Sequence, residues 1–218
     1  MKKSFVIIAV LFLATYTVKA QFLDSIRAAI ERKGRFTAGF NSRNSFITNY
    51  DAPIFGYLIG VCFDRKFAIG GGWNTLTSYR QITETVDGRI INNATLNFSY
   101  FSYYVEYLFR VTKHWEINVP ISIGIGNSSF TYTLAGITKT ANVRTVVPIE
   151  PTVEVDYYFN KYWGLSVQVG YRFMLIDNRT INQNFDFPTY STGILIFPFE
   201  IFAGLFPHTK LAHMIEDN

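Results

Sequence analysis

Apolar and polar residues alternate along most of this chain, with a period of two that begins near residue 34. Residues 115–126 show it most clearly, because the odd positions carry only Trp, Ile and Val while the even positions carry Glu, Asn, Pro, Ser and Gly. The same alternation recurs in residues 55–63, 153–159 and 163–175. A period of two predicts β-strands with two unlike faces.

The pattern predicts eight strands and one short helix. The helix is expected over residues 24–33, where Leu23, Ile26 and Ile30 share one face and Gly34 can end it. The faces of the last strand cannot be assigned, because residues 193–202 are apolar at both parities. The predicted strands are residues 34–43, 53–63, 67–80, 95–110, 115–131, 144–159, 163–176 and 189–203.

The connections between these strands alternate in length. Tight turns are expected at residues 64–66, 111–114 and 160–162. Longer polar loops, rich in Asn, Asp, Thr and Gly, are expected at residues 44–52, 81–94, 133–142 and 177–188. Strands joined in this way run antiparallel and can close on themselves. The predicted fold class is therefore all-β, an eight-stranded antiparallel up-and-down barrel with a short N-terminal helix.

Alternation alone does not say whether the apolar face points inward, as in a soluble lipocalin-like barrel, or outward to lipid. Three observations favour a transmembrane barrel. After residue 20 no lysine falls within a predicted strand, and lysine on a lipid-facing strand costs roughly 2–4 kcal/mol at the bilayer midplane. The strand glycines lie mainly on the polar face, where they make room inside a narrow barrel. Aromatic residues gather near the short turns, as in an interfacial girdle; the girdle residues are Tyr103, Tyr107, Phe109, Trp115, Tyr157, Phe159 and Trp163.

The N-terminus has the pattern of a secretory signal peptide. Lys2 and Lys3 precede the apolar run 5–14, and Val18 and Ala20 fit a cut after Ala20. Without residues 1–20 the chain keeps 17 basic and 16 acidic residues, so no basic surface for nucleic acid is expected. The single cysteine, Cys62, excludes an internal disulfide.

Residues 157–165, with the sequence YYFNKYWGL, are similar to the periplasmic hairpins of small outer-membrane β-barrel proteins of the OmpA/OmpX kind. The resemblance covers residues 34–203 and implies short periplasmic turns and surface-exposed loops. It implies outer-membrane lipids and lipopolysaccharide as surroundings, and the barrel-assembly machinery as a partner during insertion. The expected organisation is a signal peptide (1–20), a periplasmic helix (21–33), the barrel (34–203) and a periplasmic tail (204–218), which departs from barrels that stop at a terminal aromatic residue.

Charged residues on the polar face are the candidate site, because in a membrane barrel that face lines the lumen. One interpretation is an Arg–carboxylate network that fills the lumen, since buried charges must be paired. The other is a path for protons, cations or polar solutes. Near balance of the two signs and the small bore of eight strands favour the network. The candidates are Glu106, Glu116, Glu150, Glu154, Asp156, Arg43, Arg80, Arg110 and Arg172, with Glu200 and Arg35 as further members.

The function that follows is a non-enzymatic barrel with a structural or surface-interaction role, carried by loops that meet an extracellular ligand or envelope partner. The alternative is a narrow pore for small or hydrophobic solutes. A lipid-modifying enzyme comes third, because Ser128 and Ser129 lie near a loop while His114 lies in a turn at the opposite end. No cofactor and no metal site are expected. The predicted helix either lies on the inner leaflet or plugs the periplasmic mouth.

Overall fold

A computed structural model of the chain describes residues 23–206, except residues 48–49, 78–80, 87–88, 182 and 197. The predicted signal peptide and its cut, Arg80 and most of the predicted tail lie outside these residues. A helix covers residues 23–30. The elements that follow are β1 (Gly34–Ile47), β2 (Tyr50–Asp51), β3 (Ile54–Phe63), β4 (Phe67–Leu76), β5 (Gln81–Val86), β6 (Arg89–Arg110), β7 (Trp115–Leu134), β8 (Ile137–Tyr158), β9 (Trp163–Ile176), β10 (Phe187–Ile196) and α2 (Pro198–Leu205).

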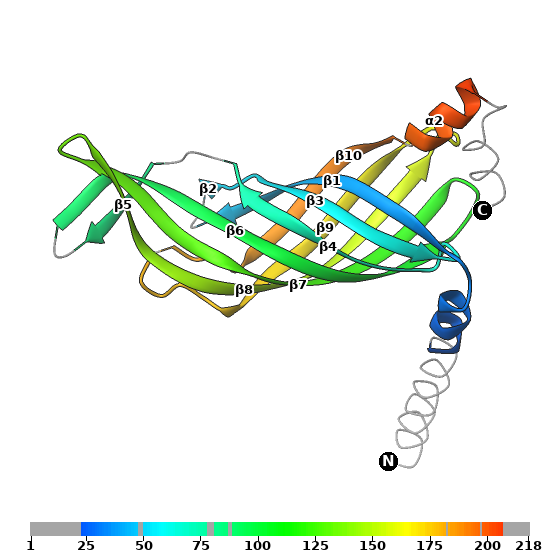
Figure 1. The fold of residues 1–218 in the computed structure, drawn as a ribbon, viewed down its shortest axis with the longest axis horizontal. Helices are drawn as coiled ribbons and strands as arrows, with labels where there is room; N and C mark the ends of the chain where they lie inside the picture. The colour runs from blue at the N-terminus through cyan, green and yellow to red at the C-terminus, as the bar shows by residue number, and fades with distance from the viewer. Residues whose placement is uncertain are drawn as a thin grey trace, which may run out of the picture.

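Eight of these strands form a closed antiparallel barrel. Along the sheet the order is β10-β9-β8-β7-β6-β4-β3-β1, and β10 pairs with β1 to close it. β2 pairs with the end of β1, and β5 lies off this order and pairs with β6. The strands are tilted to the long axis (Figure 1), as closure of a sheet requires. The predicted fold class is thus confirmed.

The alternation of residue types gives the barrel two unlike faces. Outward positions such as Tyr103, Ile123 and Val169 are 63%, 46% and 57% exposed, whereas the inward Ser102 is 3% exposed. Successive side chains of a strand point to opposite faces, so the apolar parity forms the outer surface of the barrel between the short turns and the projecting part of the strands. Among the described residues, no helix is both long enough and apolar enough to cross a membrane.

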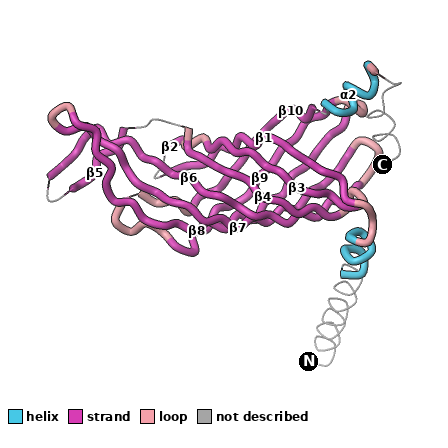
Figure 2. Tube along the Cα trace, viewed as in Figure 1, coloured by secondary structure: helices cyan, strands magenta, loops and turns pink. Residues whose placement is uncertain are grey.

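One end of the barrel carries the tight turns at residues 64–66, 111–114 and 160–162, and is called the short-turn end; the opposite end is the long-loop end. At the long-loop end three strands are longer than a membrane crossing needs. β6 and β8 have 22 residues and β7 has 20, whereas crossing a membrane takes about 9–11. Their outer parts and β5 form a projecting sheet (Figures 1 and 2), made of β5 and residues 89–98, 127–134 and 137–146.

Three predicted loops contain strand over much of their length. Residues 44–52 contain the end of β1 paired with β2. Residues 81–94 contain β5 paired with the start of β6, and residues 133–142 contain the tip of the β7–β8 hairpin. That tip is a two-residue turn in which Ala135 and Gly136 have φ of 50° and 79°, the type I′ geometry that suits twisted strands. Asn and Thr in these segments indicated loops, but threonine also fits a strand well. Lys139, expected in a loop, lies in β8 on the projecting sheet.

The last strand also ends earlier than predicted. β10 stops at Ile196, and residues 198–205 form α2 rather than a continuation of the strand to residue 203. Pro198 lacks the N–H that a strand ladder needs and is well suited to the first position of a helix. Glu200 therefore lies in α2 and not in the barrel wall. At the same end, Ser25 Oγ lies 3.0 Å from the hydroxyl of Tyr107, so the first helix contacts an outward residue and does not plug the lumen.

Candidate functional site

A buried carboxylate, Glu150, is the centre of a polar cluster in the lumen. Glu150 is 1% exposed and pairs with the guanidinium groups of both Arg43 and Arg172, which are 7% and 0% exposed. The hydroxyl of Tyr100 donates to Glu150 Oε1 over 2.9 Å. Arg43 Nη2 donates to Asn74 Oδ1 over 2.6 Å. This group, with Ser102 hydrogen-bonded to Asn74, is called the central network.

The central network joins strands on different sides of the barrel. Arg43 stands on β1, Asn74 on β4, Tyr100 on β6, Glu150 on β8 and Arg172 on β9. Its hydrogen bonds therefore cross the lumen rather than follow the wall. Two cations meet one carboxylate, and Arg43 Nε and both Nη atoms of Arg172 lack a hydrogen-bond partner among the described residues.

Glycine on the inward face leaves the space that these side chains occupy. A Cβ on Gly124 would lie 2.5 Å from the ring of Tyr100, and one on Gly70 would lie 2.6 Å from the ring of Tyr104. The sequence pattern indicated room for charged neighbours; at these two positions the room is taken by tyrosine. The inward glycines of β4 and β7 thus permit aromatic rings to lie across a narrow lumen.

Toward the long-loop end, the central network is covered by a buried apolar cluster. It includes Phe98, Phe130 and Val146 of the wall, together with Ile181 and Phe185 of the loop between β9 and β10. The rings of Phe98 and Phe185 stack with centroids 4.9 Å apart, and the Arg172 guanidinium lies 5.4 Å from the Phe98 ring centroid. The loop therefore folds over this end of the lumen.

The side chain of Asn178 fixes this loop to the wall. It is 1% exposed and donates to the carbonyl oxygens of Ser128 and Asn142, over 3.2 and 2.8 Å. Beside it, partial burial raises the pKa of Asp177, and the nearby Asp186 carboxylate acts in the same direction. The sequence pattern did not reveal this loop as part of the interior.

Toward the short-turn end, the lumen holds an acidic cluster. Glu116 and Asp156 are direct cross-strand neighbours, as are Asn118 and Glu154, and Glu106 faces the same space from β6. These carboxyl groups are held mostly by neutral donors. Ser166 Oγ donates to Glu154 over 2.5 Å, Asn118 Nδ2 to Asp156 over 2.9 Å and the Tyr158 hydroxyl to Glu116 over 2.9 Å.

The charge of Arg65 acts on Glu116 in this cluster, and Arg110 forms an ion pair with Glu116. The Nε of Arg110 lies 3.9 Å from Glu116 Oε2, and the Arg110 side chain is 49% exposed. Eight of the nine predicted lumen residues therefore divide into two groups, and Arg80 lies outside the described residues. Arg43, Glu150 and Arg172 belong to the central network. The acidic cluster toward the short-turn end contains Glu106, Glu116, Glu154, Asp156 and Arg110. Tyr100, Asn74 and Tyr158 were missed, although their inward parity as polar side chains could have indicated them.

The predicted girdle residues face outward, and most of them touch. Ring centroids of Trp115 and Tyr157 are 4.7 Å apart, those of Tyr157 and Phe159 are 5.2 Å apart, and those of Phe159 and Trp163 are 5.8 Å apart. Tyr107 and Phe109 form a second pair at 4.5 Å. Tyr103 stands farther along β6 against Phe101.

The serine and histidine considered for a lipid-modifying enzyme lie at opposite ends of the described barrel. Ser128 is buried near the long-loop end, while His114 lies in a short turn with Nδ1 2.8 Å from the carbonyl oxygen of Tyr158. Within the described residues, no three His, Cys, Asp or Glu side chains are grouped so as to hold a metal ion.

Comparison with known proteins identifies the architecture. No family model and no curated protein matches the chain. Among solved structures, Neisserial surface protein A is similar with a TM-score of 0.50 and 12% identity, over 74% of this chain and 94% of that one. Ail of Yersinia pestis, in complex with the heparin analogue sucrose octasulfate, has a TM-score of 0.45 and 13% identity, over 74% and 95%. The N-terminal β-barrel domain of Pseudomonas aeruginosa OprF has a TM-score of 0.41 and 12% identity, over 74% and 97%.

At such identities the likeness concerns the fold alone. The resemblance stated from the sequence is confirmed at that level: the chain has the fold of the small eight-stranded β-barrels of the outer membrane.

Proposed function

We propose that this outer-membrane barrel is a non-enzymatic surface protein, with a lumen filled by side chains and with its contacts made by the projecting sheet. The observation that carries the proposal is the length of β6, β7 and β8, about twice what a bilayer crossing needs. In barrels of this type short turns face the periplasm and longer segments face outward. The projecting sheet would then stand above the membrane surface.

The interior supports a filled lumen. The central network and the apolar cluster are adjacent, and both are almost wholly buried. A carboxylate between two arginines, hydrogen-bonded to Tyr100, is the arrangement expected of a charge group that holds strands together. Function is therefore assigned to the outer surface.

The outward side of the projecting sheet supports a contact surface for neutral polar groups. Its uncharged hydroxyl and amide side chains are paired across strands, and Asn97 Nδ2 donates to Thr131 Oγ1 over 2.7 Å. On the next outward position of the same strands come Phe101 and Ile125, so the surface changes from apolar to polar within two residues. This Thr/Asn face consists of Thr95, Asn97, Ser99, Asn127, Ser129, Thr131, Thr133, Thr138, Thr140 and Thr145.

The chemistry of this face fits sugar hydroxyls rather than phosphates, because none of its residues is charged. The Thr/Asn face lies directly beyond the apolar belt, at the level of the membrane surface where lipopolysaccharide carries its saccharides. We therefore assign saccharide groups at the cell surface as its partner, with the tip of the sheet left free for further contacts.

The test compares saccharide binding by the detergent-solubilised protein and by the variant Asn97→Ala/Thr131→Ala/Thr145→Ala. Binding to neutral oligosaccharides on an array should fall at least several-fold in the variant, because hydrogen-bonding groups are lost while strands and turns stay. Thr192→Ala, an outward threonine on β10, is the control and should bind normally. Equal binding by all three proteins, or binding of anionic glycans only, would contradict the proposal.

A narrow cation path is the second candidate, and the acidic cluster favours it. Four carboxyl groups gather there with Arg110 as their described ion-pair partner. The path would have to pass the central network, and an electrical measurement decides between the two candidates, as argued below.

A further inference from the structure

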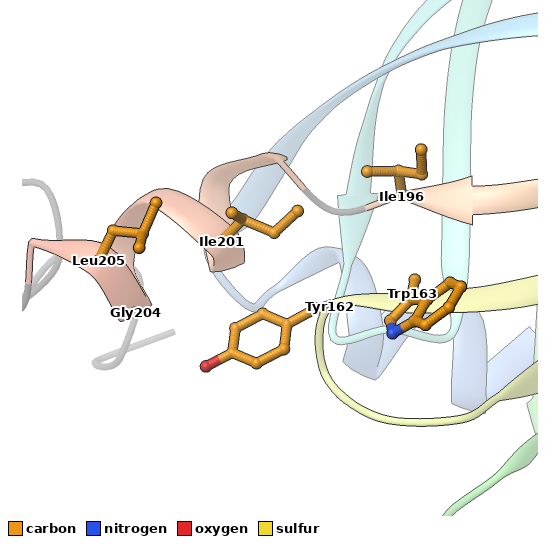
Figure 3. A pocket seen from close by; sticks show the side chains of 6 residues that line it. All are labelled: Tyr162, Trp163, Ile196, Ile201, Gly204 and Leu205. Atoms are coloured by element: carbon orange, nitrogen blue, oxygen red, sulfur yellow. The ribbon is translucent and has the colours of Figure 1, made fainter.

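A pocket at the short-turn end is not explained by a surface role. Its volume is about 490 Å³, and it lies between α2 and the adjoining ends of β9 and β10. Figure 3 shows side chains of the barrel and of α2 on opposite sides of this space. The lining residues are Tyr162, Trp163, Ile196, Ile201, Gly204 and Leu205.

The pocket opens on the lipid side of the barrel. Trp163 and Ile196 belong to the outward face and are 50% and 61% exposed. On α2, Leu205 is 69% exposed, and Phe202 and Phe206 are 38% and 52% exposed. Such a concentration of exposed apolar side chains marks a surface that meets an apolar partner. Since the same face continues into the apolar belt, that partner is the lipid of the membrane.

The approach of α2 to the barrel depends on a residue without a side chain. A Cβ on Gly204 would lie 2.8 Å from the hydroxyl oxygen of Tyr162 and 3.2 Å from its ring. Glycine therefore lets the helix backbone face the ring directly, and the pocket remains between Ile201 of the helix and Trp163 of the barrel.

A cation lies beside the pocket. Lys161 precedes Tyr162 in the tight turn, and its ammonium nitrogen is 5.2 Å from the centroid of the Tyr162 ring. One wall residue of the pocket thus also contacts a positive charge. An apolar space with a phenol hydroxyl and a lysine at its edge matches an acyl chain joined to a phosphate, because lysine is a good point-charge partner for phosphate.

We propose that α2 and the ends of β9 and β10 hold one anionic phospholipid. One acyl chain occupies the pocket, and the headgroup phosphate lies against Lys161. The site is independent of the surface role proposed above. In this proposal the role of α2 is to bind a lipid at the membrane boundary rather than to extend the barrel.

The experiment is native mass spectrometry of the full protein after reconstitution in nanodiscs that contain mostly phosphatidylethanolamine with a minority of phosphatidylglycerol. The wild-type protein should retain one phospholipid, enriched several-fold in phosphatidylglycerol over the nanodisc mixture. Gly204→Leu, which fills the pocket, and Ile201→Asp, which places a carboxylate in it, should each lower this adduct at least five-fold. Ile59→Ala, which shortens an exposed apolar side chain of β3 outside the pocket lining, should leave it unchanged.

The headgroup part of the proposal has its own matched pair. Lys161→Gln should keep the adduct but lose the enrichment in phosphatidylglycerol, while Lys113→Gln, in the neighbouring short turn, should keep both. Heat-modifiable migration on a gel checks that every variant is folded. The proposal is overturned by a wild-type protein without adduct, by an adduct equal in the folded pocket variants, by equal enrichment in the two lysine variants, or by a dimer that replaces the lipid.

Discussion

At the residue scale, Glu150 should contribute more to the stability of the barrel than either of the two arginines that it pairs with. Parity along β8 places this carboxyl group on the inner face, and that much could be predicted from the sequence. Which charges meet could not be predicted, because Arg43, Arg172 and Glu150 come from three strands and their contacts depend on barrel tilt and side-chain length. The structure gives two guanidinium groups a single carboxylate.

Neutralising Glu150 should therefore destabilise the barrel strongly. Glu150→Gln leaves two buried cations with no anion, and breaking a buried charge group in this way costs about 3–5 kcal/mol of the free energy of unfolding. Arg172→Met should cost less, because Arg43 still neutralises the carboxylate. The measurement is urea-induced unfolding in detergent micelles, followed by tryptophan fluorescence.

The same substitution four residues further along β8 is the control. Glu154→Gln removes one negative charge from the acidic cluster, so the stability should stay equal or rise. If Glu154→Gln destabilised the barrel as much as Glu150→Gln, the central network would have no special role. Because Gln keeps the size and shape of Glu, equal effects would mean that the charge of either inward carboxylate contributes equally to stability.

At the element scale, the sequence predicted strand faces well and strand ends poorly. Faces follow from a local period, which each strand shows by itself. Ends depend on partners: residues 89–94 are rich in Asn and Ile without alternation, and they become strand because they pair with β5. Residues 198–205 are apolar except for Glu200, so no period distinguished a strand from the helix that forms at Pro198.

The tip of the projecting sheet gives a test at this scale. Ala135 adopts φ of 50°, a left-handed conformation that Asn tolerates better than Ala. Ala135→Asn creates the Asn-Gly pair preferred in type I′ turns and should stabilise the hairpin by about 0.5 kcal/mol. Gly136→Val, at φ of 79°, should destabilise it. Amide hydrogen exchange at Tyr132 and Lys139, which pair across the turn, measures both effects. Faster exchange in Ala135→Asn would contradict the turn assignment.

At the scale of the whole molecule, two different layers fill the lumen, and either should prevent the passage of ions. The apolar cluster depends on Ile181 and Phe185 of the loop, whereas the central network depends on the wall alone. Wild-type protein in a planar bilayer should therefore give no reproducible single-channel current.

Replacing residues 179–185 by a short Gly-Ser linker removes the loop's apolar side chains and should leave the protein silent, because the central network still crosses the barrel. The same variant with Arg43→Ala and Tyr100→Ala should conduct, and cations should pass preferentially because the acidic cluster then lines the open path. A steady current through the wild-type protein would reject the filled lumen and favour the narrow pore, and silence of the combined variant, shown to be folded by its gel migration, would mean that the acidic cluster itself blocks the path.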